Sequence, residues 1–216
     1  TTLYIYQGKK QEAVASYLGY VERQKKDPKP VDSDFLFHLA KVAHTLKFYP
    51  DAISMAETIL ATQAKANKTQ DPNVRFTLAK FLWTANKYKE SMEQLKKLIN
   101  DTPTETFFWA LAAAFDDTGM REEAIGSLNS MRETFKPNER NMAMIYDIHA
   151  RLARLYQTKM KEKPLTDEEM KNYIDVLNAL TGYCKTLKLD GKKNLTTNPK
   201  VGDEINLPLV PWFTVV

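Results

Sequence analysis

The sequence contains a single cysteine, Cys184, among its 216 residues. One cysteine excludes an intrachain disulfide and leaves no cysteine cluster that could hold zinc or an iron–sulfur centre. The simplest interpretation of Cys184 is a small buried apolar side chain. No stretch approaches the roughly 20 consecutive apolar residues that a membrane-spanning helix needs. We therefore expect a fold that packing alone stabilises, without crosslinks or a transmembrane segment.

Glycine is also scarce, with 7 residues, whereas Ala, Leu, Lys and Glu are plentiful. An all-β protein needs turn residues at regular short intervals, so this composition favours helix. Apolar residues make up 43% and charged residues 27%, which are ordinary values for a globular protein. The net charge of +4 is mild, and the lysines are interspersed with acidic residues, so a nucleic-acid partner is not indicated.

Enzyme motifs are missing as well. The sequence has no His-Glu-x-x-His, Gly-x-Ser-x-Gly or phosphate-binding glycine loop, and its three histidines are isolated. His38 and His44 are six positions apart and would lie on different faces of a helix, which argues against a shared metal ion. Asp116 and Asp117 are adjacent, so their carboxylates diverge and are best read as solvated charge at a helix end. We expect no catalytic, cofactor or metal site, and an all-helical enzyme is the weakest hypothesis.

One spacing recurs along the chain: a residue at the end of one predicted helix is followed, nine positions later, by a small residue on the next. The four pairs are Tyr4 and Ala13, Ala43 and Ala52, Leu82 and Ser91, and Phe115 and Ala124. A short polar turn lies inside each pair, and the small residues are 39, 39 and 33 positions apart. This pattern predicts a repeating helix-turn-helix unit.

A second pattern places a Leu-Ala pair three positions before another apolar or small residue. It occurs at Leu39-Ala40 and Ala43, Leu78-Ala79 and Leu82, Leu111-Ala112 and Phe115, and Leu152-Ala153 and Tyr156. Spacings of one, three and four keep these side chains on one helical face, and alanine lets a neighbouring helix come close. We expect this face to form the packing seam, with prolines such as Pro72, Pro103 and Pro137 marking unit boundaries.

These residues resemble the tetratricopeptide repeat. The match covers roughly residues 1–160 and is clearest between Phe108 and Pro137, where the signature places carry Leu111-Ala112, Phe115, Gly119, Ala124, Leu128 and Pro137. Alanine stands in place of glycine after each leucine, and Ser91 stands where alanine is usual. The resemblance implies an all-α, right-handed solenoid of about four to five helix-turn-helix repeats that serves as a protein–protein interaction scaffold or adaptor.

We expect residues 1–187 to form the repeat array, with an incomplete first repeat and an atypical last pair. That pair consists of a long helix from about Asn138 to Lys161 and a second helix to about Leu187, which a capping box at Thr166–Glu169 opens. From Asp190 the pattern changes to Gly, Asn and Pro. We interpret residues 188–216 as an extended tail that packs on or beyond the last helices.

Four triplets on the first helix of successive units fall in register outside the packing seam. They are Phe37, Lys41 and His44; Phe76, Lys80 and Trp83; Trp109, Ala113 and Asp116; and Ala150, Arg154 and Gln157. First helices line the concave surface in tetratricopeptide arrays, so the resemblance implies that these residues form a partner-binding groove. The rings would act as apolar anchors and the cations would pair with carboxylates, which suits an acidic peptide with apolar side chains.

Two alternatives stay open from the sequence. The aromatic residues could belong to the inter-helix core, with the lysines merely solvated. The chain could instead be an architectural or oligomerisation segment of a larger assembly, with self-association as its role. The resemblance does not extend to the carboxylate clamp of chaperone-binding tetratricopeptide domains. Phe37 stands where that clamp needs a lysine, and Lys41 and Lys80 stand where it has asparagine.

Overall fold

The computed structural model describes residues 1–27, 31–138 and 140–186, with side chains as far as Tyr183. These residues form ten α-helices and no strand, which confirms the all-α helical-repeat prediction. None of the described helices is both long and apolar enough to span a bilayer. The Cys184 side chain and the predicted tail, residues 188–216, lie outside the described part of the chain.

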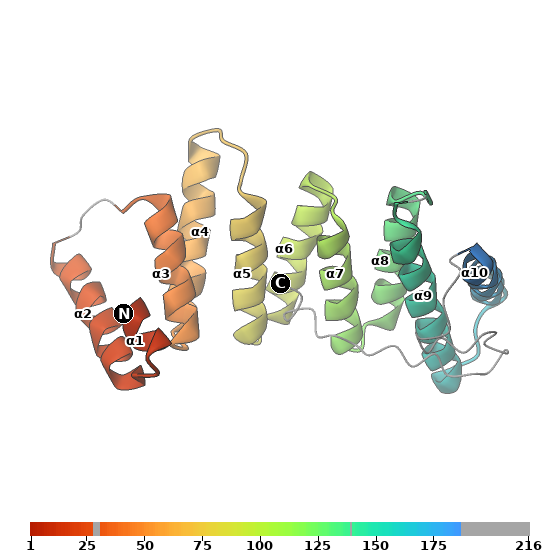
Figure 1. The fold of residues 1–216 in the computed structure, drawn as a ribbon, viewed down its shortest axis with the longest axis horizontal. Helices are drawn as coiled ribbons and strands as arrows, with labels where there is room; N and C mark the ends of the chain where they lie inside the picture. The colour runs from red at the N-terminus through yellow and green to blue at the C-terminus, as the bar shows by residue number, and fades with distance from the viewer. Residues whose placement is uncertain (28–30, 139, 187–216) are drawn as a thin grey trace. The chain divides into compact units, whose positions relative to one another are not determined.

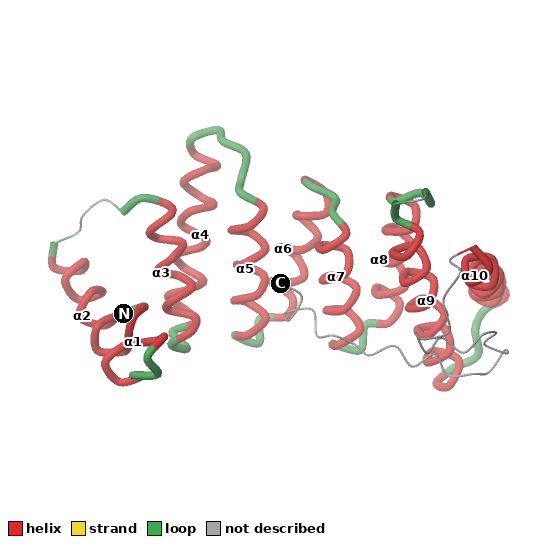
Figure 2. Tube along the Cα trace, viewed as in Figure 1, coloured by secondary structure: helices red, strands yellow, loops and turns green. Residues whose placement is uncertain are grey.

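The chain divides into two compact units, Thr1–Thr102 and the part that begins at Pro103. Unit 1 contains α1 to α6, which span Thr2–Tyr6, Lys10–Lys26, Ser33–Thr45, Tyr49–Lys65, Pro72–Thr84 and Tyr88–Asp101. In sequence order, α1 packs on α2, α3 on α4 and α5 on α6, and α4 also packs on α5. Figures 1 and 2 show these paired helices as antiparallel hairpins.

Unit 2 contains α7 to α10, which span Glu105–Asp117, Arg121–Thr134, Met142–Glu162 and Asp167–Thr186. Here α7 packs on α8 and α9 on α10, while α8 joins the two hairpins by packing on α9. In both units the odd-numbered helix opens each hairpin, and we call these five helices the first helices.

The turn that closes each of the first four hairpins has the same backbone geometry. Its central residue is left-handed, at Gly8 (φ 69°), Lys47 (φ 69°), Asn86 (φ 60°) and Gly119 (φ 74°). The following N–H donates back across the turn, from Lys9 to Tyr4, Phe48 to Ala43, Lys87 to Leu82 and Met120 to Phe115, at 2.8–2.9 Å. This is the Schellman ending of a helix, which satisfies carbonyls that the helix leaves unpaired.

The same donor residue starts the next helix. Its carbonyl accepts the N–H of the small residue four positions on, in the pairs Ala13 to Lys9, Ala52 to Phe48, Ser91 to Lys87 and Ala124 to Met120. Two consecutive backbone hydrogen bonds, across five and then four residues, therefore produce the nine-residue spacing seen in the sequence.

The predicted packing seam is confirmed. Each of its leucines and alanines is buried, and so are the small residues of the second helices, Ala13, Ala52, Ser91 and Ala124. Ser91 stands where alanine is usual, and its buried hydroxyl is not left unsatisfied, because it donates to the Ala79 carbonyl at 2.7 Å.

The last hairpin differs from the others in how its two helices begin. The helix α9 begins at Met142, later than the expected Asn138, because Asn138 and Asn141 form a turn of their own. The Asn138 side chain accepts the N–H groups of Arg140 and Asn141 at 2.9 and 3.2 Å. The predicted capping box is present at the start of α10, where Thr166 and Glu169 exchange side-chain to backbone hydrogen bonds of 2.9 and 3.3 Å.

An ion-pair network joins three helices of unit 2. Lys159 on α9 is almost fully buried, with 4% of its side chain exposed, and donates to Glu122 on α8 at 2.6 Å and to Glu169 on α10. Lys163 also donates to Glu122, at 2.9 Å. Hydrogen bonds from Lys159 and from the Thr166 backbone lower the pKa of Glu169 to about 2.

Candidate partner-binding surface

Neighbouring first helices of unit 1 touch through polar side chains. The Thr2 hydroxyl on α1 lies 3.0 Å from Nε2 of His38 on α3, and His44 Nε2 lies 2.6 Å from the Thr84 hydroxyl on α5. The His44 ring also stacks on Phe81, with centroids 4.6 Å apart. Burial lowers the pKa of His44, which favours the neutral imidazole over the charged form.

Two of the predicted triplets, on the first helices α3 and α5, share the same contact between a lysine and an aromatic ring. The Lys41 ammonium lies over the Phe37 ring at 4.1 Å from the centroid, and the Lys80 ammonium lies over the Phe76 ring at 4.7 Å. Both rings are half-buried, and Phe37 packs against the core of unit 1. Lys41 is exposed, whereas burial lowers the pKa of the half-buried Lys80.

The third predicted residue on α5, Trp83, is half-buried. Its ring meets the edge of Tyr88 on α6 at 4.7 Å between centroids. We call Phe37, Lys41, His44, Phe76, Lys80 and Trp83 the first-helix surface of unit 1.

In unit 2 the cation that lies over the aromatic ring comes from a different first helix than the ring itself. The guanidinium of Arg151 on α9 lies over the Trp109 ring on α7 at 4.8 Å, and the Trp109 indole N–H donates to Glu105 at 3.2 Å. Burial and the nearby Arg154 lower the pKa of Arg151, while Asp147 and Asp116 act in the opposite direction.

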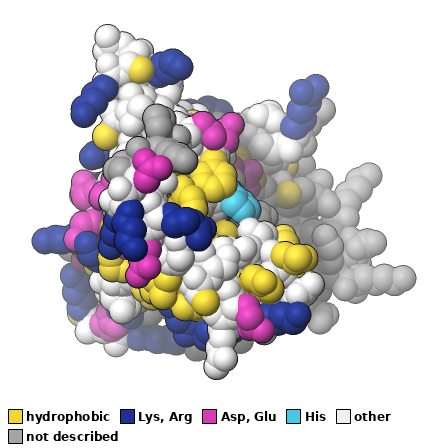
Figure 3. Space-filling model, turned by 90° about the vertical axis from the view of Figure 1, so that its left-hand side faces the viewer, with side chains coloured by type: hydrophobic (Ala, Val, Ile, Leu, Met, Phe, Trp, Pro, Cys, Tyr) yellow, Lys and Arg dark blue, Asp and Glu magenta, His cyan; other side chains and the backbone are white. Residues whose placement is uncertain are grey.

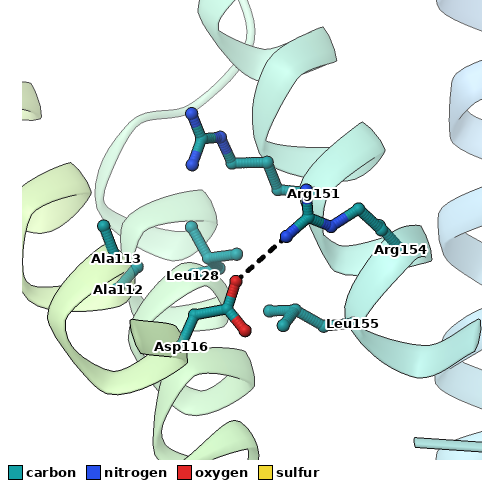
Figure 4. A pocket seen from close by; sticks show the side chains of 7 residues that line it. All are labelled: Ala112, Ala113, Asp116, Leu128, Arg151, Arg154 and Leu155. Atoms are coloured by element: carbon teal, nitrogen blue, oxygen red, sulfur yellow. Dashed lines mark hydrogen bonds and ion pairs between the residues drawn. The ribbon is translucent and has the colours of Figure 1, made fainter. Parts of the chain in front are cut away.

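The predicted cation Arg154 already has a carboxylate partner. Its guanidinium donates to Asp116 on α7 at 3.1 Å, and both side chains are largely covered. A small hollow lies beside this ion pair, lined by Ala112, Ala113, Asp116, Leu128, Arg151, Arg154 and Leu155. Figure 4 shows the Arg154 side chain reaching Asp116 while Arg151 extends away from that pair. Gln157, the last predicted residue, is half-buried on α9.

Arg151 was not predicted from the sequence, because the spacing placed Ala150 in register with Phe37, Phe76 and Trp109. Ala150 is fully buried and does not reach the surface. Arg151 lies five positions before Tyr156, as His38 lies five positions before Ala43, and both side chains contact the preceding first helix. That shared offset is the signal in the sequence that could have identified Arg151.

No group of three or more His, Cys, Asp or Glu side chains is arranged to hold a metal ion within residues 1–27, 31–138 and 140–183.

No protein-family model matches the chain, and no curated protein sequence matches it. The chain is similar to a crystal structure of nearly identical TPR-like repeats from Podosopora anserina, described as a kinesin light chain. The two sequences are 18% identical, the match covers 88% of this chain and 93% of that chain, and the TM-score is 0.55. A glutamine-to-methionine variant of those repeats gives 19% identity, coverage of 86% and 92%, and a TM-score of 0.53. A crystal structure of MamA gives 15% identity, coverage of 83% and 95%, and a TM-score of 0.49. The helical-repeat fold of this chain is that of tetratricopeptide proteins.

Proposed function

We propose that this chain is a protein–protein interaction scaffold or adaptor that binds a segment of a partner protein on the first-helix surface of unit 1. The observation that carries the proposal is the repeated pair of a lysine over an aromatic ring, on α3 and again on α5. A contact that recurs in register on adjacent helices offers equivalent positions to successive residues of a bound segment.

The charges of this surface favour an acidic partner. Within the described residues, Lys41 and Lys80 have the rings as their contacts and form no ion pair. A cation–ring contact that water can reach gains about 0.5–1 kcal/mol, whereas a charge-assisted hydrogen bond gains about 1.5–3 kcal/mol. A carboxylate of the partner therefore competes successfully for each ammonium, and the uncovered ring face then meets an apolar side chain.

The test is binding of fluorescein-labelled twelve-residue peptides that alternate Glu with Leu or Phe, measured by fluorescence anisotropy. We expect K41E/K80E to weaken binding at least tenfold, because each substitution replaces attraction by repulsion. The matched control, K89E/K97E, makes the same charge change at exposed lysines of α6 and should bind as the native chain does. Equal binding by native protein and a folded K41E/K80E variant would refute the proposed surface.

Self-association is a second candidate function, and the exposed apolar side chains of α1 and α2 favour it. Leu3, Tyr6 and Leu18 are 66%, 86% and 43% exposed. Figure 3 looks onto this side of unit 1, where apolar side chains gather between lysines and arginines. If this face joins two copies, light scattering should give a dimer mass that L3D/L18D returns to the monomer mass. A monomer at high concentration argues against it.

A further inference from the structure

We infer that a hollow between the start of α5 and the end of α6 binds the carboxamide side chain of an asparagine or glutamine in a partner protein. The hollow has a volume of about 260 Å³ and is lined by residues of unit 1. Its buried lining includes Arg75 and Leu98, and its exposed lining Thr69, Asp101 and Thr102. We call it the Arg75 hollow. It shares no residue with the first-helix surface, so the inference goes beyond the proposed function.

Arg75 supplies hydrogen-bond donors to the hollow. Only 10% of its side chain is exposed, and its guanidinium donates to Oε1 of Gln94 at 3.1 Å and to Oε1 of Gln70. A guanidinium carries five N–H groups, so these side-chain hydrogen bonds use two of them within the described residues. The buried cation therefore keeps N–H groups for an acceptor that enters the hollow.

Asp101 supplies an acceptor beside those donors. Its Oδ2 lies 4.0 Å from Nη2 of Arg75, which is beyond hydrogen-bond distance, and 65% of its side chain is exposed. The oxygen and nitrogen of a primary carboxamide lie about 2.2 Å apart on one edge of a planar group. Laid alongside the two charged groups, a carboxamide can accept from Arg75 and donate to Asp101 through hydrogen bonds of about 2.9 Å.

The charges of the lining favour a neutral ligand. Arg75 and Asp101 carry opposite charges, so a carboxylate would be repelled by Asp101 and an ammonium group by Arg75. A peptide group is neutral too, but its trans geometry directs the C=O and N–H to opposite sides. Pro72 and Leu98 add apolar surface on which the methylene groups of the side chain can pack. Asparagine and glutamine meet all of these conditions.

The experiment is an NMR titration of the ¹⁵N-labelled full chain with N-acetyl-glutamine N-methylamide. We expect the Arg75 Nε–H and the Thr102 backbone N–H resonances to shift and saturate. The corresponding glutamate analogue should bind about tenfold more weakly, which corresponds to the loss of one charge-assisted hydrogen bond. The leucine analogue, which has no polar side-chain atom, should leave both resonances unmoved. Equal responses to the three analogues would overturn the inference.

The D101N variant tests the acceptor without altering the buried arginine. It removes the charge that balances Arg75, so the glutamate analogue should now bind more tightly than the glutamine analogue. The matched control E90Q removes an exposed carboxylate eleven residues earlier on the same helix, roughly 16 Å away. It should keep the native order of binding. A folded D101N variant that also keeps the native order contradicts the site.

This test and the test of the proposed function can fail independently. The K41E/K80E variant leaves the lining of the Arg75 hollow intact and should bind the glutamine analogue as the native chain does. Loss of glutamine binding in a folded K41E/K80E variant would place the site on the first-helix surface instead and overturn the inference.

Discussion

At the scale of single residues, the hairpin turns show how an unfavourable backbone conformation is tolerated. Gly8 and Gly119 adopt the left-handed conformation without a side-chain clash, whereas Lys47 and Asn86 adopt it with a Cβ atom. The lysine is the less suited of the two, because asparagine visits this region more readily. The two hydrogen bonds that close each turn hold Lys47 in place despite this strain.

We therefore predict that K47G stabilises the protein. The left-handed conformation costs a non-glycine residue about 1–2 kcal/mol, partly offset by the greater freedom of glycine in the unfolded chain, so the free energy of unfolding should rise by about 1 kcal/mol. Urea denaturation measures it. K65G, on the last turn of α4, is the control and should lower the same quantity by about 0.5–1 kcal/mol. A K47G variant no more stable than the native protein would show that Lys47 is unstrained.

At the scale of elements, the ion-pair network decides how α8 and α10 are held on α9. Burial alone would lower the pKa of Lys159, but hydrogen bonds to Glu122 and Glu169 outweigh it and raise the pKa. A buried cation that loses both carboxylates costs about 3–5 kcal/mol, whereas replacing the cation by an apolar side chain of similar size is often neutral. We predict that E122Q/E169Q destabilises unit 2 strongly and that K159M does so little.

Urea denaturation followed by the Trp109 indole resonance measures both variants in unit 2. The pH provides a second check. Since the pKa of Glu169 is about 2 in the folded protein and near 4.5 when unfolded, its contribution is fully present above pH 4.5 and is lost as the pH falls toward 2. E169Q should reduce this acid sensitivity, and E168Q, at the exposed neighbour, should keep it. Equal destabilisation by K159M and E122Q/E169Q would contradict the network's role.

The elements themselves were predictable because their signals are local. The spacing of Ala43 and Ala52, for example, follows from two backbone hydrogen bonds within one turn, and the Leu-Ala pairs follow from helical periodicity. The start of α9 was less predictable, since it depends on which of several polar side chains around Asn138 and Asn141 bonds to the backbone. Sequence spacing does not distinguish among such turns.

At the scale of the whole molecule, the candidate surface was predictable only in part. In unit 1, Phe37 and Lys41 lie four positions apart on one helix, so their contact could be read from the sequence. In unit 2, the Trp109 contact comes from Arg151 on a different helix, and Ala150 is covered by neighbouring helices. Contacts between helices depend on rotation about the helix axis, which a one-residue difference changes by about 100°.

The hydrogen-bonded turns have a consequence for where this chain can change in length. From Ala52 to Ser91 and from Ser91 to Ala124, the first helix has 13 residues in both cases and the turn is equally long. The whole difference between the spacings of 39 and 33 lies in α4, with 17 residues against 14 for α6, and in the loop that follows. Insertions and deletions should therefore accumulate between hairpins, at residues 66–71 or 102–104, whereas one added residue within a turn would break two backbone bonds at once.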